Sequence, residues 1–379
     1  MNAIVRFATA LLICAIAVPV LSQSRVAPSR LTIQGTQFVR AGGNRFEWRG
    51  ITAFRLLEMI ARGRTSDVEA YLDWCAKQGL TVVRVLTMAK HLFALGPDEG
   101  RAALPRLLDL AAKRGLYVEI VALADTAEIP LDMDHHVREI GTIAAKHANA
   151  IVEIANEPVH GTQLARIHDP AEVQRLARLV PDAVPVALGA ADDERFAGGD
   201  YATVHLSRDS GDRGWAHVTA LATAATLLRK WGKPVVNDEP IGAGDELDPG
   251  RRDDSPERFR AAALLSRMIG MGATFHYEDG LHARLPEGLQ RECFNAWQDA
   301  WTVLPAGPFT FTNPGSKDAP VQSAKGEFAG AYLAVRAGRA WLLVTHARGD
   351  VAVTWSEGWE VADRRTWGES AWIAAVRTQ

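Results

Sequence analysis

The sequence has little net charge and no concentration of charge of one sign. Its 379 residues contain 42 lysines and arginines against 45 aspartates and glutamates, so the formal net charge is −3. A basic tail or basic stripe is absent, which argues against nucleic acid as a partner. The near-neutral balance fits an uncharged substrate. The sequence also has no low-complexity tract and no internal repeat beyond the strand–helix unit described below.

Cysteine is scarce, with three residues in the chain. Cys14 lies in the N-terminal apolar segment, which leaves Cys75 and Cys293. The expected positions of these two are the first and last helices of a closed barrel, which are neighbours. An oxidising compartment would permit a disulfide between them. Two buried thiols are the commoner outcome for such a pair and are the favoured prediction.

The chain begins with a segment typical of export signals. Arg6 is followed by an apolar stretch over residues 7 to 21, and small residues suit cleavage after Ser22. The stretch is too short for a comfortable membrane span of about 20 residues. We therefore expect residues 1–22 to be a cleaved signal peptide and the mature protein to be secreted or periplasmic, without membrane attachment. A retained N-terminal anchor is the alternative.

Short β-rich runs alternate with helical runs from about residue 44 onward. This alternation predicts a parallel sheet with crossover helices. Eight such units in about 260 residues predict an α/β fold of the (β/α)8 TIM-barrel class. The expected strands cover residues 46–52, 81–86, 117–123, 151–157, 184–189, 201–206, 234–239 and 273–278. The clearest helices are expected at residues 101–114, 135–147, 171–179, 218–231, 255–271 and 288–303.

Two segments flank the predicted barrel. Residues 31 to 46 are typical of a short hairpin that could plug its lower end. After about Pro308 the pattern changes to alternating antiparallel strands, most clearly over residues 332–335, 340–345 and 351–355. We expect a catalytic barrel over residues 30–305 and a small, sandwich-like, all-β domain over 308–379. Five tryptophans in that domain favour a core role over sugar binding, namely Trp341, Trp355, Trp359, Trp367 and Trp372.

Polar residues at the strand ends indicate the chemistry, because active sites of such barrels lie at the C-terminal ends of the strands. The fourth predicted strand ends in Asn156-Glu157-Pro158 and the seventh in Asp238-Glu239-Pro240. These strands lie across the barrel mouth from each other, so Glu157 and Glu239 can converge on one bound group. Asp238 is the rival of Glu239, since alternation along a strand directs only one of them into the lumen.

Two converging carboxyl groups suit glycoside hydrolysis. One carboxylic acid must protonate the departing oxygen, and one carboxylate must attack the anomeric carbon or activate water. Neighbouring carboxyl groups resist being charged together, which keeps one protonated and one ionised. Arg84, near the end of the second strand, could hold the ionised partner through a hydrogen-bonded ion pair. The alternative partner of Arg84 is Glu153, deeper on the strand that carries Glu157.

The Asn156-Glu157-Pro158 triplet on strand four, together with Glu239 on strand seven, resembles glycoside hydrolase clan A, which includes family 5. The resemblance covers roughly residues 30 to 305. It implies a retaining reaction that uses no metal or cofactor, with Glu157 as acid/base and Glu239 as nucleophile. It also implies that Asn156 binds the sugar 2-hydroxyl and that Arg84 and His205 are site residues.

The sequence departs from the family pattern on two strands. Strand six lacks the tyrosine that often follows the histidine by two positions. Strand eight reads Phe275-His276-Tyr277-Glu278 and lacks the tryptophan that commonly forms a sugar platform. Tyr277 or Phe275 could take that place, and we expect Tyr277 to bind substrate.

The resulting prediction is a retaining glycoside hydrolase for a β-linked oligo- or polysaccharide, with a two-glutamate double-displacement mechanism. One alternative is a carbohydrate-binding barrel that has lost the chemistry. Another is a metal-dependent barrel enzyme with Asp125, Glu157 and Glu239 as oxygen ligands. The polar loop over residues 242–255 either covers part of the cleft or is simply solvated.

Overall fold

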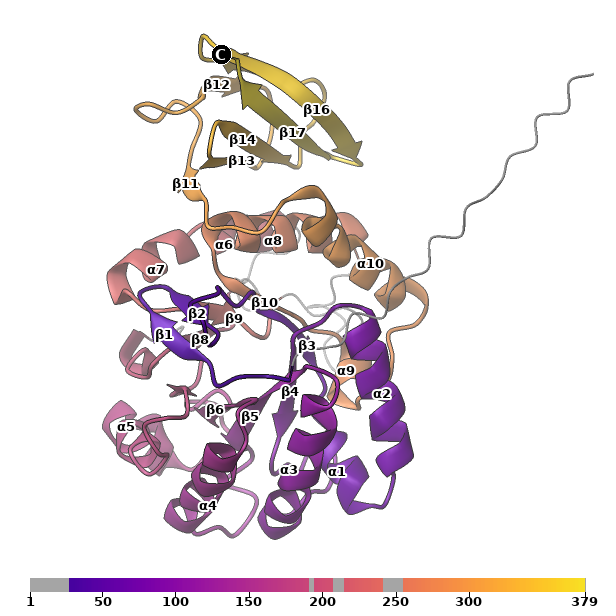
Figure 1. Ribbon diagram of the computed structural model, residues 1–379, viewed down its shortest axis with the longest axis vertical. Coiled ribbons are helices and arrows are strands. Elements are labelled where there is room, and N and C mark those ends of the chain that lie inside the picture. The colour runs from indigo at the N-terminus through magenta and orange to yellow at the C-terminus, as the bar shows by residue number, and fades with distance from the viewer. Residues whose placement is uncertain (1–26, 191–193, 207–214, 241–254, 379) are drawn as a thin grey trace, which may run out of the picture.

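The chain folds into a barrel, and the C-terminal part of the chain forms a separate β-sheet region (Figure 1). The structure is a computed structural model that describes residues 27–190, 194–206, 215–240 and 255–378. Eight parallel strands form one sheet in the order β7-β6-β5-β4-β3-β10-β9-β8. A parallel bridge between Ala190 and Thr203 joins the two ends of this sheet and closes it. The predicted (β/α)8 fold is confirmed, whereas the predicted signal peptide and most of the loop over 242–255 lie outside the described residues.

The barrel strands are short and almost completely buried. Several end earlier than the sequence predicts, so Glu157, Glu239 and Tyr277 lie in the connections just beyond strand ends. Residues at such positions are free of the strand's strict in–out alternation. The strands are β3 (Arg49–Thr52), β4 (Val82–Leu86), β5 (Tyr117–Leu123), β6 (Ala150–Ala155), β7 (Val186–Ala187), β8 (Ala202–Val204), β9 (Val235–Asn237) and β10 (Gly272–Phe275).

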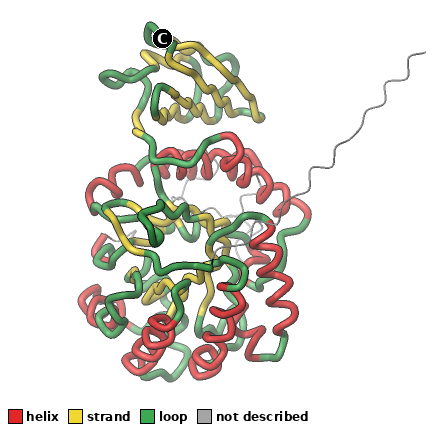
Figure 2. Tube along the Cα trace, viewed as in Figure 1, coloured by secondary structure: helices red, strands yellow, loops and turns green. Residues whose placement is uncertain are grey.

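Helices surround the strands as an outer layer (Figure 2). They are α1 (Leu56–Ala61), α2 (Thr65–Lys77), α3 (Pro97–Ala112), α4 (Met133–Lys146), α5 (Pro170–Ala177), α6 (Trp215–Leu221), α7 (Ala224–Trp231), α8 (Pro256–Ile269), α9 (Glu278–Leu281) and α10 (Gly288–Val303), with short 3-10 turns at Ala165–His168 and Glu194–Phe196. The single helix predicted over residues 218–231 is wrong. It is divided into α6 and α7 at Thr223, whose hydroxyl donates to the carbonyl of Ala220. In the described part of the chain, no helix has the length and apolar character needed to cross a membrane.

The N-terminal hairpin closes the lower end of the barrel, as predicted. Strands β1 (Thr32–Gln34) and β2 (Gln37–Val39) pair antiparallel. The ring of Phe38 lies 5.3 Å from both Trp48 and Tyr201, measured between ring centroids. These rings pack on the first residues of the barrel strands, so the lumen opens to solvent at the opposite, C-terminal end.

The C-terminal region forms two small antiparallel sheets. One has the order β11-β13-β14-β17-β16 and the other pairs β12 with β15. The all-β character predicted for this region is confirmed, while the exact domain limits remain a prediction. The strands are β11 (Thr310–Thr312), β12 (Val321–Lys325), β13 (Gly330–Arg336), β14 (Arg339–Thr345), β15 (Ala352–Trp355), β16 (Trp359–Trp367) and β17 (Ser370–Arg377).

The central strand β14 of the larger C-terminal sheet is buried on both faces, whereas the edge strand β16 is largely exposed. Along β14, Leu342 and Val344 pack against the smaller sheet, whereas Trp341 and Leu343 join the hydrophobic core of the barrel. Figure 1 shows this sheet above α6 and α8. The five tryptophans of the region belong to these two clusters, which supports the packing role favoured by the sequence.

Cys75 on α2 and Cys293 on α10 are both buried thiols. The favoured prediction for this pair was therefore right, and the alternative of a disulfide is wrong.

Candidate active site

A tight turn after β6 presents Glu157. Its backbone has a φ of +44°, in the left-handed region that few residues other than glycine adopt. The buried side chain of Gln163 fixes this turn, because its amide donates to the Asn156 carbonyl at 2.5 Å and its oxygen accepts from the Thr126 hydroxyl at 2.8 Å. The Glu157 side chain is 24% exposed, so substrate can reach it.

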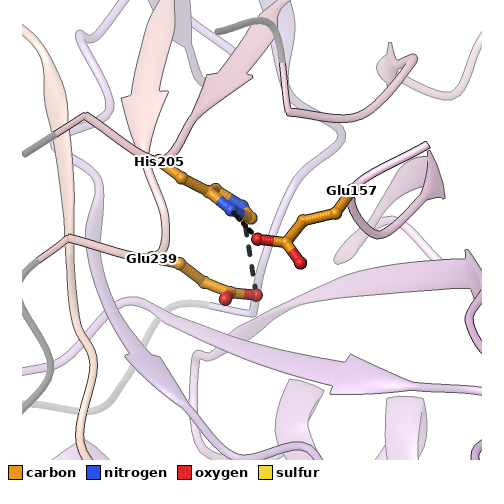
Figure 3. A group of neighbouring side chains, drawn as sticks. All are labelled: Glu157, His205 and Glu239. Atoms are coloured by element: carbon orange, nitrogen blue, oxygen red, sulfur yellow. Dashed lines mark hydrogen bonds and ion pairs between the residues drawn. The ribbon is translucent and has the colours of Figure 1, made fainter. Parts of the chain in front are cut away.

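Glu157, His205 and Glu239 converge at the C-terminal end of the barrel (Figure 3). His205 follows the last residue of β8, and its Nδ1 lies 3.0 Å from Glu157 Oε1. Its Nε2 lies 3.9 Å from Glu239 Oε1. One polar atom from each of the three residues lies within 4.8 Å of the others. The two glutamates singled out in the sequence thus meet in space, 82 positions apart in the chain.

Arg84 on β4 connects the predicted site residues. Its guanidinium is fully buried and donates to Glu239 Oε1 through Nη1. Through Nη2 it donates to Asn156 Oδ1 at 2.9 Å and to Glu153 Oε2 at 2.8 Å. The two partners that the sequence offered as alternatives, Glu239 and Glu153, are therefore bound at the same time. Asn156 is held beside Glu157 by the same cation.

Asp238 is also part of the site, which corrects the expectation that only one of Asp238 and Glu239 faces the lumen. Asp238 Oδ2 lies 3.1 Å from Arg84 Nε, and its side chain is fully buried. The physical reason is that β9 ends at Asn237, so alternation no longer controls the next two residues. The double acid at the end of a strand was the available signal in the sequence.

Electrostatics keep two positive charges beside Glu239. Burial disfavours the charged form of His205, but the carboxylates of Glu239 and Asp238 outweigh it and raise the pKa of His205 well above its ordinary value. Burial also opposes the charge on Arg84, and the surrounding carboxylates raise the pKa of its guanidinium in the same way. Glu239 therefore has cationic partners that favour its ionised form.

Tyr277 lies away from this group, and the expectation that it binds substrate is not supported. Its side chain is completely buried, its hydroxyl donates to the Arg284 carbonyl at 2.5 Å, and the Tyr71 hydroxyl on α2 lies 3.0 Å away. The tyrosine faces the helical layer and offers no open ring face to a sugar. The preceding residue, His276, instead has its Nδ1 2.9 Å from the Thr52 hydroxyl on β3.

The arrangement is poorly suited to a metal ion. Asp125, the third ligand in the metal hypothesis, accepts from the backbone N–H groups of Lys90 and His91 at 2.7 and 3.2 Å and thereby caps a turn. Arg84 already supplies the positive charge next to Glu239. The residues present therefore fit a metal-independent site better.

Comparison with solved structures identifies similar barrels. A glycoside hydrolase structure matches at a TM-score of 0.57 and 13% identity, over 92% of this chain and 97% of that chain. A glycoside hydrolase family 5 protein from Bacteroides vulgatus matches at 0.58 and 11%, over 92% and 93%. The β-glucanase SdGluc5_26A from Saccharophagus degradans matches at 0.54 and 11%, over 73% and 94%. No protein-family model matches the sequence, and no curated protein matches it either.

These similarities concern the fold, because the sequence identities are low. The first two structures match over more than nine-tenths of this chain, so the likeness extends past the barrel into the C-terminal strands. The chain has the barrel fold of glycoside hydrolase family 5 structures, as the resemblance of its strand-end glutamates to clan A predicted.

Proposed function

We propose that this protein is a retaining glycoside hydrolase that cleaves β-linked oligo- or polysaccharides, with Glu157 as acid/base and Glu239 as nucleophile. The observation that carries the proposal is the approach of Glu157, His205 and Glu239, each with one polar atom within 4.8 Å of the others. Retaining enzymes separate their carboxyl groups by about 5–5.5 Å, whereas inverting enzymes need about 6.5–9.5 Å to admit a water molecule. The close approach favours direct displacement.

Glu239 has the surroundings of a nucleophile. Its side chain is 3% exposed and accepts a charge-assisted hydrogen bond from Arg84. Such a bond keeps the carboxylate ionised and holds one oxygen in place. The other oxygen can then attack the anomeric carbon from a fixed direction, which lowers the entropic part of the barrier.

Glu157 has the surroundings of an acid that becomes a base. While Glu239 is ionised, a second negative charge nearby is unfavourable, so the proton stays on Glu157 for the leaving oxygen. Once Glu239 is esterified its charge is lost, and Glu157 can remain ionised to accept a proton from water. His205 contacts both carboxyl groups and can respond to this change of charge.

A carbohydrate substrate is supported by the structural neighbours and by Asn156. The Saccharophagus degradans β-glucanase is described in complex with cellotetraose, and a further neighbour from Streptomyces cattleya in complex with GlcNAc. In this chain, Arg84 binds the oxygen of the Asn156 amide. The NH₂ group of Asn156 is thereby oriented as a donor for the sugar 2-hydroxyl.

The decisive experiment is covalent trapping. A panel of activated aryl β-glycosides identifies a substrate, and its 2-fluoro analogue is then incubated with the protein and the labelled peptide mapped by mass spectrometry. We expect the label on Glu239, and Glu239→Ala should form no ester. Labelling of a different residue would refute the nucleophile assignment.

Variants at Glu157 test the other role. Glu157→Gln should slow the second step, and azide should partly restore turnover of activated substrates by replacing the base-assisted water. Glu128→Gln, an exposed glutamate beyond β5, is the matched control and should behave like the wild type. Calorimetric binding of an intact oligosaccharide without turnover would instead identify a non-hydrolytic binding barrel. Loss of activity with a chelator would indicate the metal-dependent alternative.

A further inference from the structure

Three fully buried carboxyl groups lie beneath the candidate catalytic pair. Glu119 on β5, Glu153 on β6 and Asp238 after β9 each place one oxygen within 4.8 Å of the others. Arg84 lies 3.6 Å from Glu119, 2.8 Å from Glu153 and 3.1 Å from Asp238. With Glu239, four carboxyl groups surround one guanidinium.

The charges of this group do not balance if every carboxyl is ionised. His205 supplies a second cation, with Nε2 3.4 Å from Asp238 Oδ1. Four negative and two positive charges would leave a net charge of −2 in a region closed to water. Burying an ionised group without a compensating charge is strongly unfavourable, and a proton bound to one carboxylate removes that penalty.

The hydrogen bonds indicate where a proton belongs. Both oxygens of Glu153 accept hydrogen bonds, one from Arg84 and one from the Thr203 hydroxyl at 3.2 Å. Tyr201 donates to Glu119 Oε1 at 3.0 Å. In the part of the chain that the structure describes, Glu119 Oε2 is buried without a hydrogen-bond donor, and the oxygens of Asp238 meet Arg84 and His205 as ion pairs at 3.1 and 3.4 Å. A proton on one of these two carboxyl groups provides the missing donor.

We propose that Glu119 and Asp238 share one proton and, together with Glu153, act as positioning residues that fix Arg84 beneath Glu239. Burial, together with the charges of Asp238 and Glu153, raises the pKa of Glu119 well above its ordinary value, which is consistent with a carboxyl that stays protonated at neutral pH. The location of the proton is independent of the proposed function. Its effect on catalysis rests on that function.

The polar groups around the trio come from neighbouring strands and from the residues that follow them. Strand β4 contributes Arg84, and the β8 region contributes Tyr201, Thr203 and His205. His276, which follows β10, pairs with Thr52 on β3. Arg84 and His205 are the cations in this set, and both are already in contact with Asp238.

The shared proton should affect activity at alkaline pH. Its loss adds a negative charge on the inner side of Arg84, and that charge competes with Glu239 for the guanidinium. Two ionisations then lower activity in the wild type, that of the proposed acid Glu157 and that of the shared proton. The logarithm of activity should fall with a slope of about two against pH, where a single ionisation gives about one. Glu119→Gln cannot lose this proton, and its amide can still donate to Asp238, so its slope should be about one.

Infrared spectroscopy of the intact protein tests the proton without any substrate. At neutral pH we expect, besides any bands of protonated Glu157 and Glu153, a further carbonyl band of a protonated carboxylic acid, which both Glu119→Gln and Asp238→Asn lose. Glu292→Gln, an exposed glutamate on α10, is the control and should keep it. If Glu119→Gln does not fold, Asp238→Asn alone provides the test. In that variant the negative charge of Asp238 is gone, so Glu119 should ionise and its band should disappear.

Absence of the band in the wild type, or its persistence in both variants, would overturn the proposal. An alkaline slope of about one in the wild type would refute the catalytic part. If the band behaves as expected while no glycoside is cleaved, the proton assignment stands and the proposed function fails. The two failures are therefore distinguishable.

Discussion

His205 lies against Glu157, with 3.0 Å between Nδ1 of the imidazole and Oε1 of the carboxyl group. Burial opposes a charge on His205, but Glu239 and Asp238 raise its pKa well above the ordinary range. The raised pKa favours the cationic form of the imidazole, which can donate toward Glu157. His205 thus connects Glu157 and Glu239, the proposed acid/base and nucleophile, without a bound ligand.

Replacing His205 should impair chemistry more than substrate binding. His205→Gln keeps hydrogen-bonding capacity but removes the charge, so we expect kcat to fall about 10- to 100-fold, equivalent to a charge-assisted hydrogen bond of about 1.5–3 kcal/mol. KM should change much less. Steady-state kinetics on an aryl glycoside measures this, with His160→Gln on the exposed loop as control. Equal losses in the two variants would contradict the role of His205.

Arg84 should tolerate no substitution, including lysine. An ammonium group keeps the charge but cannot reach Glu153, Asn156 and Glu239 at once, as the planar guanidinium does. We expect Arg84→Lys to lose at least about 100-fold in kcat/KM and Arg84→Met to lower the free energy of unfolding by about 3–5 kcal/mol, because buried carboxylates are left uncompensated.

Arg62 offers the matched comparison. It pairs with Glu99 at the surface, where both side chains are more than 40% exposed. Arg62→Met should change urea unfolding little, because solvent screens an exposed ion pair. If both arginines proved equally dispensable, the proposed importance of the buried network would be wrong.

Stability should decrease as pH rises through neutrality. Burial raises the pKa of Glu153 to about 7, despite the opposing effect of Arg84. The folded state thus binds more protons than the unfolded state above about pH 4.5, and the raised pKa of His205 acts in the same direction. We expect the free energy of unfolding to be at least about 2 kcal/mol higher at pH 5.5 than at pH 8, which is the share of Glu153 alone over about 1.5 pH units at about 1.4 kcal/mol per unit, and the raised pKa of Glu119 adds to it.

Urea unfolding at the two pH values measures this difference. Glu153→Gln has no proton to lose and should flatten the dependence. A wild-type protein that becomes more stable toward pH 8 would disprove the assignment.

The barrel and the C-terminal sheet should unfold together. Trp341 is 5% exposed and its ring lies 5.4 Å from that of Phe309 in the junction with the barrel. Trp341→Ala should lower the free energy of unfolding by about 3–5 kcal/mol and shift one common calorimetric transition. Trp359→Ala, on the side of the smaller sheet, should cost less. Two separate transitions in the wild type would show that the parts are independent.

Local sequence signals predicted the barrel and the glutamate pair well, because parallel strands place their C-terminal ends together. Prediction failed where the outcome depends on the last residue of a strand. Asp238 faces inward because β9 ends one residue earlier. Tyr277 faces α2 because packing, rather than residue type, determines which side of β10 is enclosed.

The buried trio shows a different limit. Glu119 and Glu153 each stand alone inside an apolar strand, which is a visible signal of an interior charge. Their meeting with Asp238 depends on the register of four strands around the closed barrel. A pattern along one strand does not contain that register.

The left-handed backbone conformation of Glu157 lowers the stability of the folded protein at the position of the proposed acid/base. A residue with a Cβ in this conformation is about 1–2 kcal/mol less favourable than in the right-handed form, and glycine largely avoids this penalty. Glu157→Gly and Glu157→Ala remove the same carboxyl group, yet the glycine variant should melt at the higher temperature. A search for heat-stable variants would therefore tend to replace Glu157, the carboxyl group that the proposed reaction needs.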